Sequence, residues 1–318
     1  MPRRKKWLNR SALTDIILPE YGLCVKTIKP MTAGVMNENV RVTTDLGTVV
    51  VRRSPKKSAT ETQFERTMLG TLASQQFPCP HPMLTKNGHD HLVMNGHPVM
   101  VYPLLSGRAV TRGTPSIMRQ LGLWQAMIHT TIVHLPHART QRTWDPDDLK
   151  KLARRHRTIL ARSSVPLLND LAPWIERELN DFHFPATLPR GMTHQDIKPE
   201  NVLIRNGRVS GILDFDNAYN GVLLHDLTTT ILWWCFPNGR LDRHLADAFI
   251  KGYERRRRLT RDERRLLLTE GLRFRFIREM FIGPLTTLDQ PTILKKRLAH
   301  FWKLYQNTFG SKEKSAPR

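Results

Sequence analysis

The fold is decided by the stretch Thr193-His194-Gln195-Asp196-Ile197-Lys198-Pro199-Glu200-Asn201-Val202-Leu203-Ile204, followed by Asp214-Phe215-Asp216 after an apolar pair. Three of its polar residues, Asp196, Asn201 and Asp214, sit around a predicted hairpin and are bounded by segments that are typical of strands. The arrangement therefore predicts a short β-rich insertion with polar residues at the ends of its strands.

The connection inside this insertion predicts which residues come together. Residues 202–205 and 209–213 read as strands, and Asn206-Gly207 lies between them. Asn-Gly strongly favours a two-residue hairpin turn. A hairpin brings Asn201 and Asp214 to neighbouring strand ends, where their oxygens suit Mg²⁺.

A carboxylate next to such a metal pair points to phosphoryl transfer. Asp196 belongs to the loop just before the hairpin. Phosphoryl transfer needs a metal that neutralises phosphate charge and a carboxylate that orients or deprotonates the attacking hydroxyl. We therefore expect Mg²⁺-dependent phosphoryl transfer to a hydroxyl group.

The composition is that of an ordinary globular chain and not of a disordered, fibrous or membrane protein. The 318 residues include 50 Lys+Arg and 28 Asp+Glu, a net charge of +22, which favours anionic partners. Three cysteines without a CxxC pair indicate neither a zinc site nor a disulfide scaffold and favour a reducing cytoplasm. No apolar run approaches the length needed to cross a bilayer. The sequence does not predict the oligomeric state.

The pattern of elements changes after the first hundred residues. Strands are expected at 25–29, 40–44, 48–53, 91–94 and 99–104 around a helix at 59–74, and helices dominate afterwards apart from residues 192–215. This predicts an α+β, bilobal fold with a small β-rich lobe and a larger helical lobe. The expected parts are a basic tail (1–14), a nucleotide-binding lobe (15–102), a helical catalytic lobe (103–309) and a disordered tail (310–318).

The motif H-x-D-x-x-x-x-N followed by D-F-x resembles the catalytic core of the protein-kinase-like superfamily, in its aminoglycoside phosphotransferase-like branch. Within that branch the chain is most similar to the type II homoserine kinases, over about residues 15–280. The finer resemblance rests on Gly34-Val35-Met36-Asn37-Glu38-Asn39, Leu188-Pro189-Arg190-Gly191, Gly211-Ile212-Leu213-Asp214-Phe215, Leu224-His225-Asp226-Leu227 and Trp234-Cys235-Phe236.

The resemblance implies an ATP- and Mg²⁺-dependent kinase that acts on the hydroxyl of a small molecule, and it implies roles for the central motif. Asp196 would be the catalytic base or would orient the hydroxyl, and Asn201 and Asp214 would bind Mg²⁺. His194 would brace the catalytic loop, and Lys198 matches a lysine that protein kinases have at this spacing. Residue 226 is an aspartate that would support the loop from the following helix.

The resemblance also implies a nucleotide site in the small lobe. Arg52 would hold the phosphates where protein kinases use Lys, with Arg53 as an alternative, and Glu65 would pair with it. The remaining positions are Gly34 and Asn37 over the phosphates, and Val101 and Tyr102 at a hinge against adenine. Asp216, which replaces the Gly of D-F-G, adds a possible second metal ligand.

The acceptor remains open at this stage. L-homoserine is preferred by resemblance alone, and choline, methylthioribose, aminoglycosides and hydroxylated amino acids are alternatives. Homoserine would need an acidic and a basic partner, for which Asp216 and an arginine are candidates. A protein kinase is disfavoured by the short segment between Asp216 and Asp226.

A nucleic-acid-binding role is the remaining alternative. It would use the basic C-terminal helices, which contain Arg255–Arg258, Arg273, Arg275, Arg278 and residues 295–297. A solvated helical face is the preferred interpretation of these charges, because no nucleic-acid-binding motif accompanies them.

Overall fold

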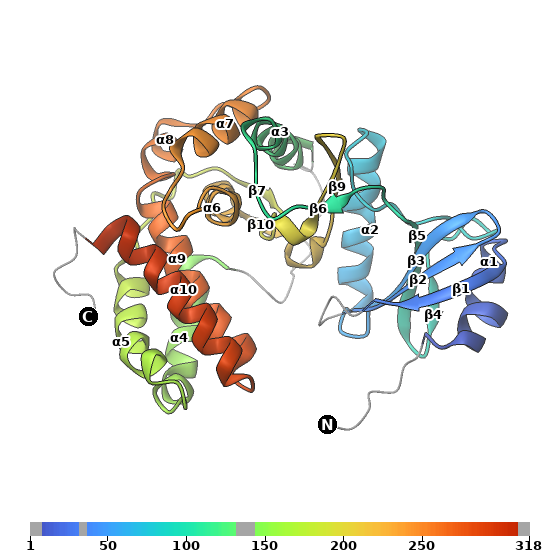
Figure 1. Cartoon of the computed structure of the whole chain (residues 1–318), viewed down its shortest axis with the longest axis horizontal. Helices are drawn as coiled ribbons and strands as arrows, with labels where there is room; N and C mark the ends of the chain where they lie inside the picture. Colours follow the sequence, from blue (N-terminus) through green and yellow to red (C-terminus); the bar gives the residue numbers. More distant parts are fainter. Residues whose placement is uncertain (1–7, 32–36, 132–143, 311–318) are drawn as a thin grey trace.

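The computed structural model describes residues 8–31, 37–131 and 144–310 and has two lobes (Figure 1). A β-sheet with its helices forms the small lobe, and most helices gather in the large lobe. The helix α2 (Ala59–Ser74) lies between the sheet and the large lobe in this view. The predicted α+β bilobal class is confirmed.

The small lobe is built on a five-stranded antiparallel sheet with strand order β1-β2-β3-β5-β4. Alternate residues Val40, Val42, Val49 and Val51 turn one face of the sheet toward a buried core. Such alternation is what a half-buried antiparallel sheet requires. The strands are β1 (Val25–Pro30), β2 (Glu38–Thr44), β3 (Gly47–Arg53), β4 (Leu92–Met94) and β5 (His97–Pro103).

The N-terminal segment packs on this sheet. A π-helix, η1 (Ala12–Ile17), leads into the short α1 (Leu18–Glu20). Leu8 and Leu13 are buried in the small-lobe core, so packing begins before residue 15. The predicted tail is therefore shorter than expected among the described residues, and residues 1–7 lie outside them.

The helix α2 presents Glu65 to the sheet side of the molecule. Its start is fixed by a capping box between Ser58 and Glu61, which satisfies two backbone N–H groups. Glu65 is 2% exposed. The capping box is a local signal for the start of α2, and the bounds predicted from the sequence, 59–74, are confirmed.

The large lobe contains eight α-helices in the described ranges, together with short strands that support the catalytic loop. The helices are α3 (Pro115–Thr131), α4 (Pro146–Ala161), α5 (Pro166–Asp181), α6 (Leu223–Trp234), α7 (Arg243–Glu254), α8 (Arg261–Leu266), α9 (Glu270–Thr287) and α10 (Pro291–Phe309). β10 (Tyr219–Val222) pairs with β7 (Arg190–Thr193), and β6 (Arg108–Ala109) pairs with β8 (Val202–Arg205), which pairs with β9 (Arg208–Ile212).

Helices α3 and α7 approach each other through glycine. A Cβ atom on Gly122 would lie 2.1 Å from the Phe249 carbonyl oxygen, and one on Gly252 would lie 2.0 Å from the Arg119 carbonyl oxygen. Real Cβ atoms do not approach backbone so closely, so only glycine permits this crossing. The two glycines therefore allow α3 and α7 to pack closely against each other.

The C-terminal helices differ from the sequence-based expectation. Two separate helices, α8 and α9, follow each other here, with Thr269 before the second. Arg275 and Arg278 are 2% and 5% exposed, so the prediction of a solvated face is wrong for both. Within the described ranges, no helix is long and apolar enough to span a membrane.

Candidate active site

The predicted hairpin forms and brings its two ends together. Val202 of β8 pairs with Ile212 of β9, and the Leu213 N–H donates to the Asn201 carbonyl at 2.8 Å. Asp214 follows directly, in a left-handed conformation with φ of 64°. Such a backbone is unusual for a residue other than glycine and is typical of functional sites. Asn201 and Asp214 therefore lie at adjacent strand ends.

Asp196 is held by two side chains of its own loop. Asn201 Nδ2 donates to the Asp196 carbonyl at 2.9 Å and to Oδ2 at 3.0 Å. Lys198 Nζ lies 2.9 Å from the same Oδ2. The Asp196 side chain is 14% exposed. The carboxylate is thus oriented, with its Oδ1 atom left for a ligand.

His194 joins the catalytic loop to the second strand of the hairpin. Its Nδ1 accepts the Asp196 N–H at 3.2 Å, and its Nε2 lies 3.1 Å from the Leu213 carbonyl, to which it donates. The ring also contacts Phe215. Both nitrogens are engaged by backbone in a neutral ring, which fits a bracing role.

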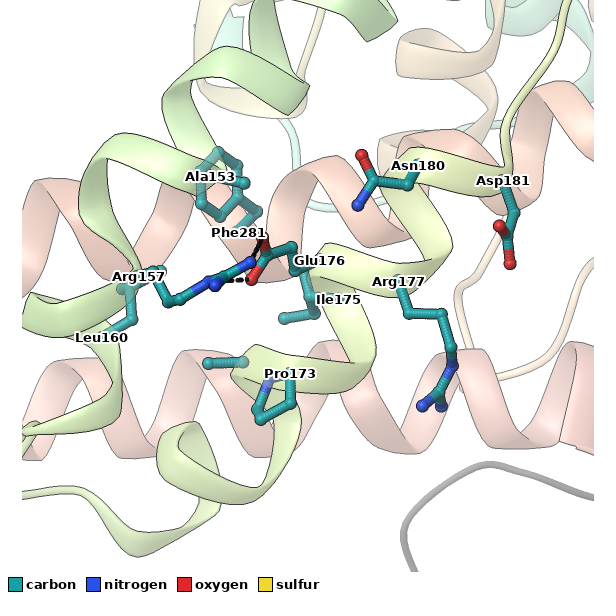
Figure 2. A pocket seen from close by; sticks show the side chains of 11 residues that line it. Ala153, Arg157, Leu160, Pro173, Ile175, Glu176, Arg177, Asn180, Asp181 and Phe281 are labelled. Carbon is teal, nitrogen blue, oxygen red and sulfur yellow. Dashed lines mark hydrogen bonds and ion pairs between the residues drawn. The ribbon is translucent and has the colours of Figure 1, made fainter.

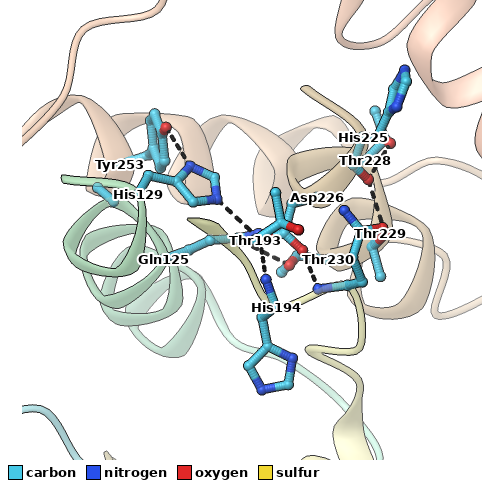
Figure 3. A network of polar contacts seen from close by, with 12 residues as sticks. Gln125, His129, Thr193, His194, His225, Asp226, Thr228, Thr229, Thr230 and Tyr253 are labelled. Carbon is cyan, nitrogen blue, oxygen red and sulfur yellow. Dashed lines mark hydrogen bonds and ion pairs between the residues drawn. The ribbon is translucent and has the colours of Figure 1, made fainter. Parts of the chain in front are cut away.

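Asp226 supports the loop from α6 (Figure 3). It is fully buried, and its Oδ2 accepts the His194 N–H at 3.0 Å while Oδ1 accepts the Gln195 N–H at 2.5 Å. His129 Nε2 lies 3.0 Å from Oδ2. Burial alone would raise the pKa of Asp226, but these hydrogen bonds outweigh it and lower the pKa to about 2.

The far side of this network fixes the tautomer of His129. Arg257 donates to the Tyr253 hydroxyl at 3.0 Å, and that hydroxyl lies 2.7 Å from His129 Nδ1. The hydroxyl therefore donates to Nδ1, and Nε2 carries the proton that Asp226 accepts. A chain of hydrogen bonds thus runs from α7 to the catalytic loop.

In the small lobe, Arg52 meets Glu65 as predicted, with Nη1 and Oε1 3.1 Å apart. Arg52 also forms an ion pair with Asp216. Burial would lower the pKa of Arg52, but Glu65 and Asp216 more than compensate and raise it. Arg53, on the opposite face of β3, lies 4.0 Å from Glu38 instead.

Lys57 is a member of this cluster that the sequence analysis missed. Its Nζ lies 2.6 Å from both Glu65 Oε2 and Asp216 Oδ1. Asn37 Nδ2 donates to Asp216 Oδ2 at 2.6 Å. We name Asn37, Arg52, Lys57, Glu65 and Asp216 the interlobe cluster, because it joins β2, β3 and α2 to the segment after β9.

The interlobe cluster separates the roles of the two aspartates of D-F-D. Burial opposes ionisation of Asp216, but Arg52 and Lys57 lower its pKa. Its carboxylate is paired with Arg52 and Lys57, and its role as a second metal ligand or an acceptor contact stays a prediction. Asp214 accepts no hydrogen bond from a described residue. Burial, together with the nearby carboxylates of Asp216 and Asp196, raises the pKa of Asp214, and a cation bound here would offset the negative charge of the three carboxylates.

The remaining nucleotide positions lie as follows. Val101 and Tyr102 are buried in β5, where Val101 pairs with Val51 and its carbonyl accepts the Met83 N–H at 2.8 Å. Their role at a hinge against adenine stays a prediction. Gly34 lies outside the described residues.

A separate pocket lies away from this site (Figure 2). It has a volume of about 550 Å³ and is lined by residues of α4, α5 and Phe281 of α9. Arg157 and Glu176 form a two-bond ion pair across it, with Nε and Oε2 2.8 Å apart. None of the predicted site residues lines this pocket.

Comparisons with known proteins agree with this geometry. Residues 27–267 match the model of the phosphotransferase enzyme family, and the chain belongs to that family. A homoserine kinase of Zymomonas mobilis subsp. mobilis is 28% identical over 82% of each chain. A homoserine kinase of Paramagnetospirillum magneticum is 29% identical over 80% of each chain.

Solved structures share the fold. A microcompartment-associated aminopropanol kinase superposes with a TM-score of 0.68 at 17% identity, covering 92% of this chain and 95% of that one. A spectinomycin phosphotransferase in complex with ADP and spectinomycin gives a TM-score of 0.66 at 16% identity and covers 94% of each chain. The chain is therefore a phosphotransferase with the bilobal fold of small-molecule kinases.

Proposed function

We propose that this chain transfers the γ-phosphoryl group of ATP to the hydroxyl of L-homoserine. The observation that carries the proposal is the orientation of Asp196 by Asn201, at 3.0 Å, next to the strand end that bears Asp214. The homoserine kinases similar to this chain over about four-fifths of their length support the choice of acceptor.

The donor set fits a hard divalent cation. The Asn201 amide nitrogen donates to Asp196, so its Oδ1 remains available as a ligand. Asp214 offers a carboxylate in surroundings that favour a bound cation. We assign Mg²⁺ to this pair, where it would neutralise charge on the ATP phosphates.

The chain's own residues then position the acceptor. Asp196 would accept a hydrogen bond from the attacking hydroxyl and take its proton, while Lys198 and Asn201 hold that carboxylate in place. His194 and Asp226 fix the backbone of the loop. Because the work is mainly positioning and charge stabilisation, loss of Asp196 should lower kcat by about 10³-fold.

The small lobe would hold the nucleotide. Within the interlobe cluster, Arg52, Lys57 and Asn37 supply hydrogen-bond donors, and Glu65 orients the Arg52 and Lys57 side chains. We assign these residues to the phosphates and the chain beyond Tyr102 to adenine. Three free cysteines support a reducing compartment, and we propose the cytoplasm.

The test is acceptor-dependent ADP release by the purified chain. L-homoserine, choline, methylthioribose, 4-hydroxyproline and an aminoglycoside are compared, with Asp196→Asn as the matched inactive variant. We expect turnover to need ATP, Mg²⁺ and L-homoserine, and to fall about 10³-fold in the variant. Higher kcat/KM for another acceptor would overturn the substrate, and full activity of Asp196→Asn would overturn the mechanism.

A further inference from the structure

A group of buried polar atoms lies next to the catalytic loop without hydrogen-bond partners among the described residues. They are Trp144 Nε1, Gln195 Nε2, and both ring nitrogens of His225. Gln195 is 2% exposed and His225 is fully buried. A buried polar atom that lacks a partner is costly, and native proteins contain few of them. Four in one neighbourhood indicate a place where a polar ligand completes the hydrogen bonding.

These atoms gather around one buried cation. Arg278 Nη1 donates to Gln195 Oε1 at 2.5 Å, and its guanidinium carbon lies 5.1 Å from the centre of the Trp144 ring. No carboxylate of the described residues forms an ion pair with Arg278. Its neighbour Glu279 is instead paired with Arg275 at 2.6 Å and with Arg297 at 2.7 Å.

The surroundings of Arg278 favour an anionic ligand. Burial and the nearby Arg275 lower the pKa of Arg278 to about 9. A buried guanidinium without a counterion is unfavourable, and a bound carboxylate would relieve it through a charge-assisted pair. The free N–H groups of Gln195 and Trp144 are donors of the kind that a carboxylate accepts.

A carboxylate lies next to the group. Asp145 Oδ1 is 4.0 Å from His225 Nδ1 and accepts the Tyr219 hydroxyl at 3.2 Å. Its Oδ2 accepts from Arg190 at 2.6 Å. The Asp145 side chain is 19% exposed, so it can receive a cationic group from a ligand.

His225 lies near both the carboxylate of Asp145 and the guanidinium of Arg278. Burial, together with Arg278, Arg190 and Arg275, lowers the pKa of His225 to about 3. The ring is therefore neutral near pH 7 and offers one donor and one acceptor. It is enclosed by the Phe184 and Phe274 rings, whose centres lie 4.9 and 4.7 Å away. An acidic group, a basic group and aromatic side chains in one neighbourhood match the chemistry of a short amino acid.

We propose that Trp144, Asp145, Gln195, His225 and Arg278 form the acceptor subsite and select an α-amino acid zwitterion. Arg278 binds the α-carboxylate, with N–H groups from Gln195 and Trp144, and Asp145 binds the α-ammonium. The assignment rests on the proposed kinase function. Gln195 directly precedes Asp196, so an amino acid held here lies beside the carboxylate that would accept the hydrogen bond and the proton of its hydroxyl.

The test pairs substrate groups with side chains. L-homoserine is compared with 4-hydroxybutyrate, which lacks the ammonium, and with 3-aminopropan-1-ol, which lacks the carboxylate. Arg278→Met should lower kcat/KM for L-homoserine by about 100-fold and leave the poor activity with 3-aminopropan-1-ol within a factor of about three. Asp145→Asn should lower kcat/KM for L-homoserine and should leave the activity with 4-hydroxybutyrate, which lacks the ammonium, little changed.

Controls separate the failure of this assignment from failure of the kinase function. Arg273→Gln, on the same helix but paired with Glu178, should change kcat/KM for the three acceptors equally. Absence of homoserine turnover in the wild type refutes the kinase proposal itself. Wild-type turnover combined with equal losses for all three acceptors in Arg278→Met and Asp145→Asn refutes the subsite.

A variant that fails to fold does not end the test. Arg278→Lys keeps the charge but loses the planar two-bond geometry, and it should raise the KM for L-homoserine about tenfold with an unchanged KM for ATP. The wild type gives an independent readout. If it uses either analogue as well as L-homoserine, zwitterion selection is wrong.

Discussion

The buried aspartate behind the catalytic loop gives the sharpest prediction. In Asp226→Asn, one carboxylate oxygen becomes an NH₂ group that can only donate. Oδ1 accepts from Gln195, and Oδ2 accepts from His194 and from His129. Whichever way the amide is turned, at least one buried N–H loses its acceptor and faces another donor.

The magnitude follows from those contacts. Each buried donor without an acceptor costs about 1–3 kcal/mol, and loss of the charge weakens the remaining bonds. We therefore expect Asp226→Asn to reduce the free energy of unfolding by about 3–5 kcal/mol. Because Gln195 and Asp196 move with the loop, kcat should fall more than KM for ATP rises.

Urea denaturation and steady-state kinetics check this prediction against a matched control. Asp242 also accepts a backbone N–H, from Leu245 at 3.1 Å, but at the exposed start of α7. Asparagine caps helices as well as aspartate does, so Asp242→Asn should alter the free energy of unfolding by less than about 0.5 kcal/mol. If Asp226→Asn is equally mild and retains wild-type kcat, the network does not hold the loop.

Three further predictions concern charge, pH and packing. Lys57→Met should raise the KM for ATP about tenfold or more, and Lys26→Met, on exposed β1, should not; equal kinetics would exclude Lys57 from the nucleotide site. The pKa of Asp226 is lowered from 3.8 to about 2, so its stabilisation of about 2 kcal/mol is complete above pH ~4 and disappears as pH falls toward 2. Urea titrations should therefore show the gap between wild type and Asp226→Asn narrowing over that interval, and a constant gap would contradict the lowered pKa. Gly122→Ala should lower the melting temperature through overpacking of about 1–3 kcal/mol, whereas Gly310→Ala, whose Cβ would make an ordinary contact with the Gln306 Cβ at 3.6 Å, should not.

Local sequence signals predicted the catalytic hairpin because its determinants are close along the chain. Asn206 and Gly207 adopt φ of 51° and 72°, which is the turn that Asn-Gly favours. The strand pairing then fixes the positions of Asn201 and Asp214 without any distant contact. The capping box of α2 has the same local character.

Contacts between distant segments could not be predicted in this way. Arg278 and Gln195 are 83 residues apart in sequence, and Lys57 meets Asp216 across the two lobes. An arginine in an apolar neighbourhood, as in Phe274-Arg275-Phe276-Ile277-Arg278, is a signal that could have indicated burial. Its partner depends on how α9 packs against the catalytic loop, which no local pattern contains.

The central claim is that the chain moves a phosphoryl group to the hydroxyl of L-homoserine. Phosphorus NMR of a reaction with ATP, Mg²⁺ and L-homoserine tests it most directly. The account predicts a phosphate monoester that grows in step with ADP and is absent with Asp196→Asn. Formation of inorganic phosphate alone, or a monoester that persists in that variant, would contradict it.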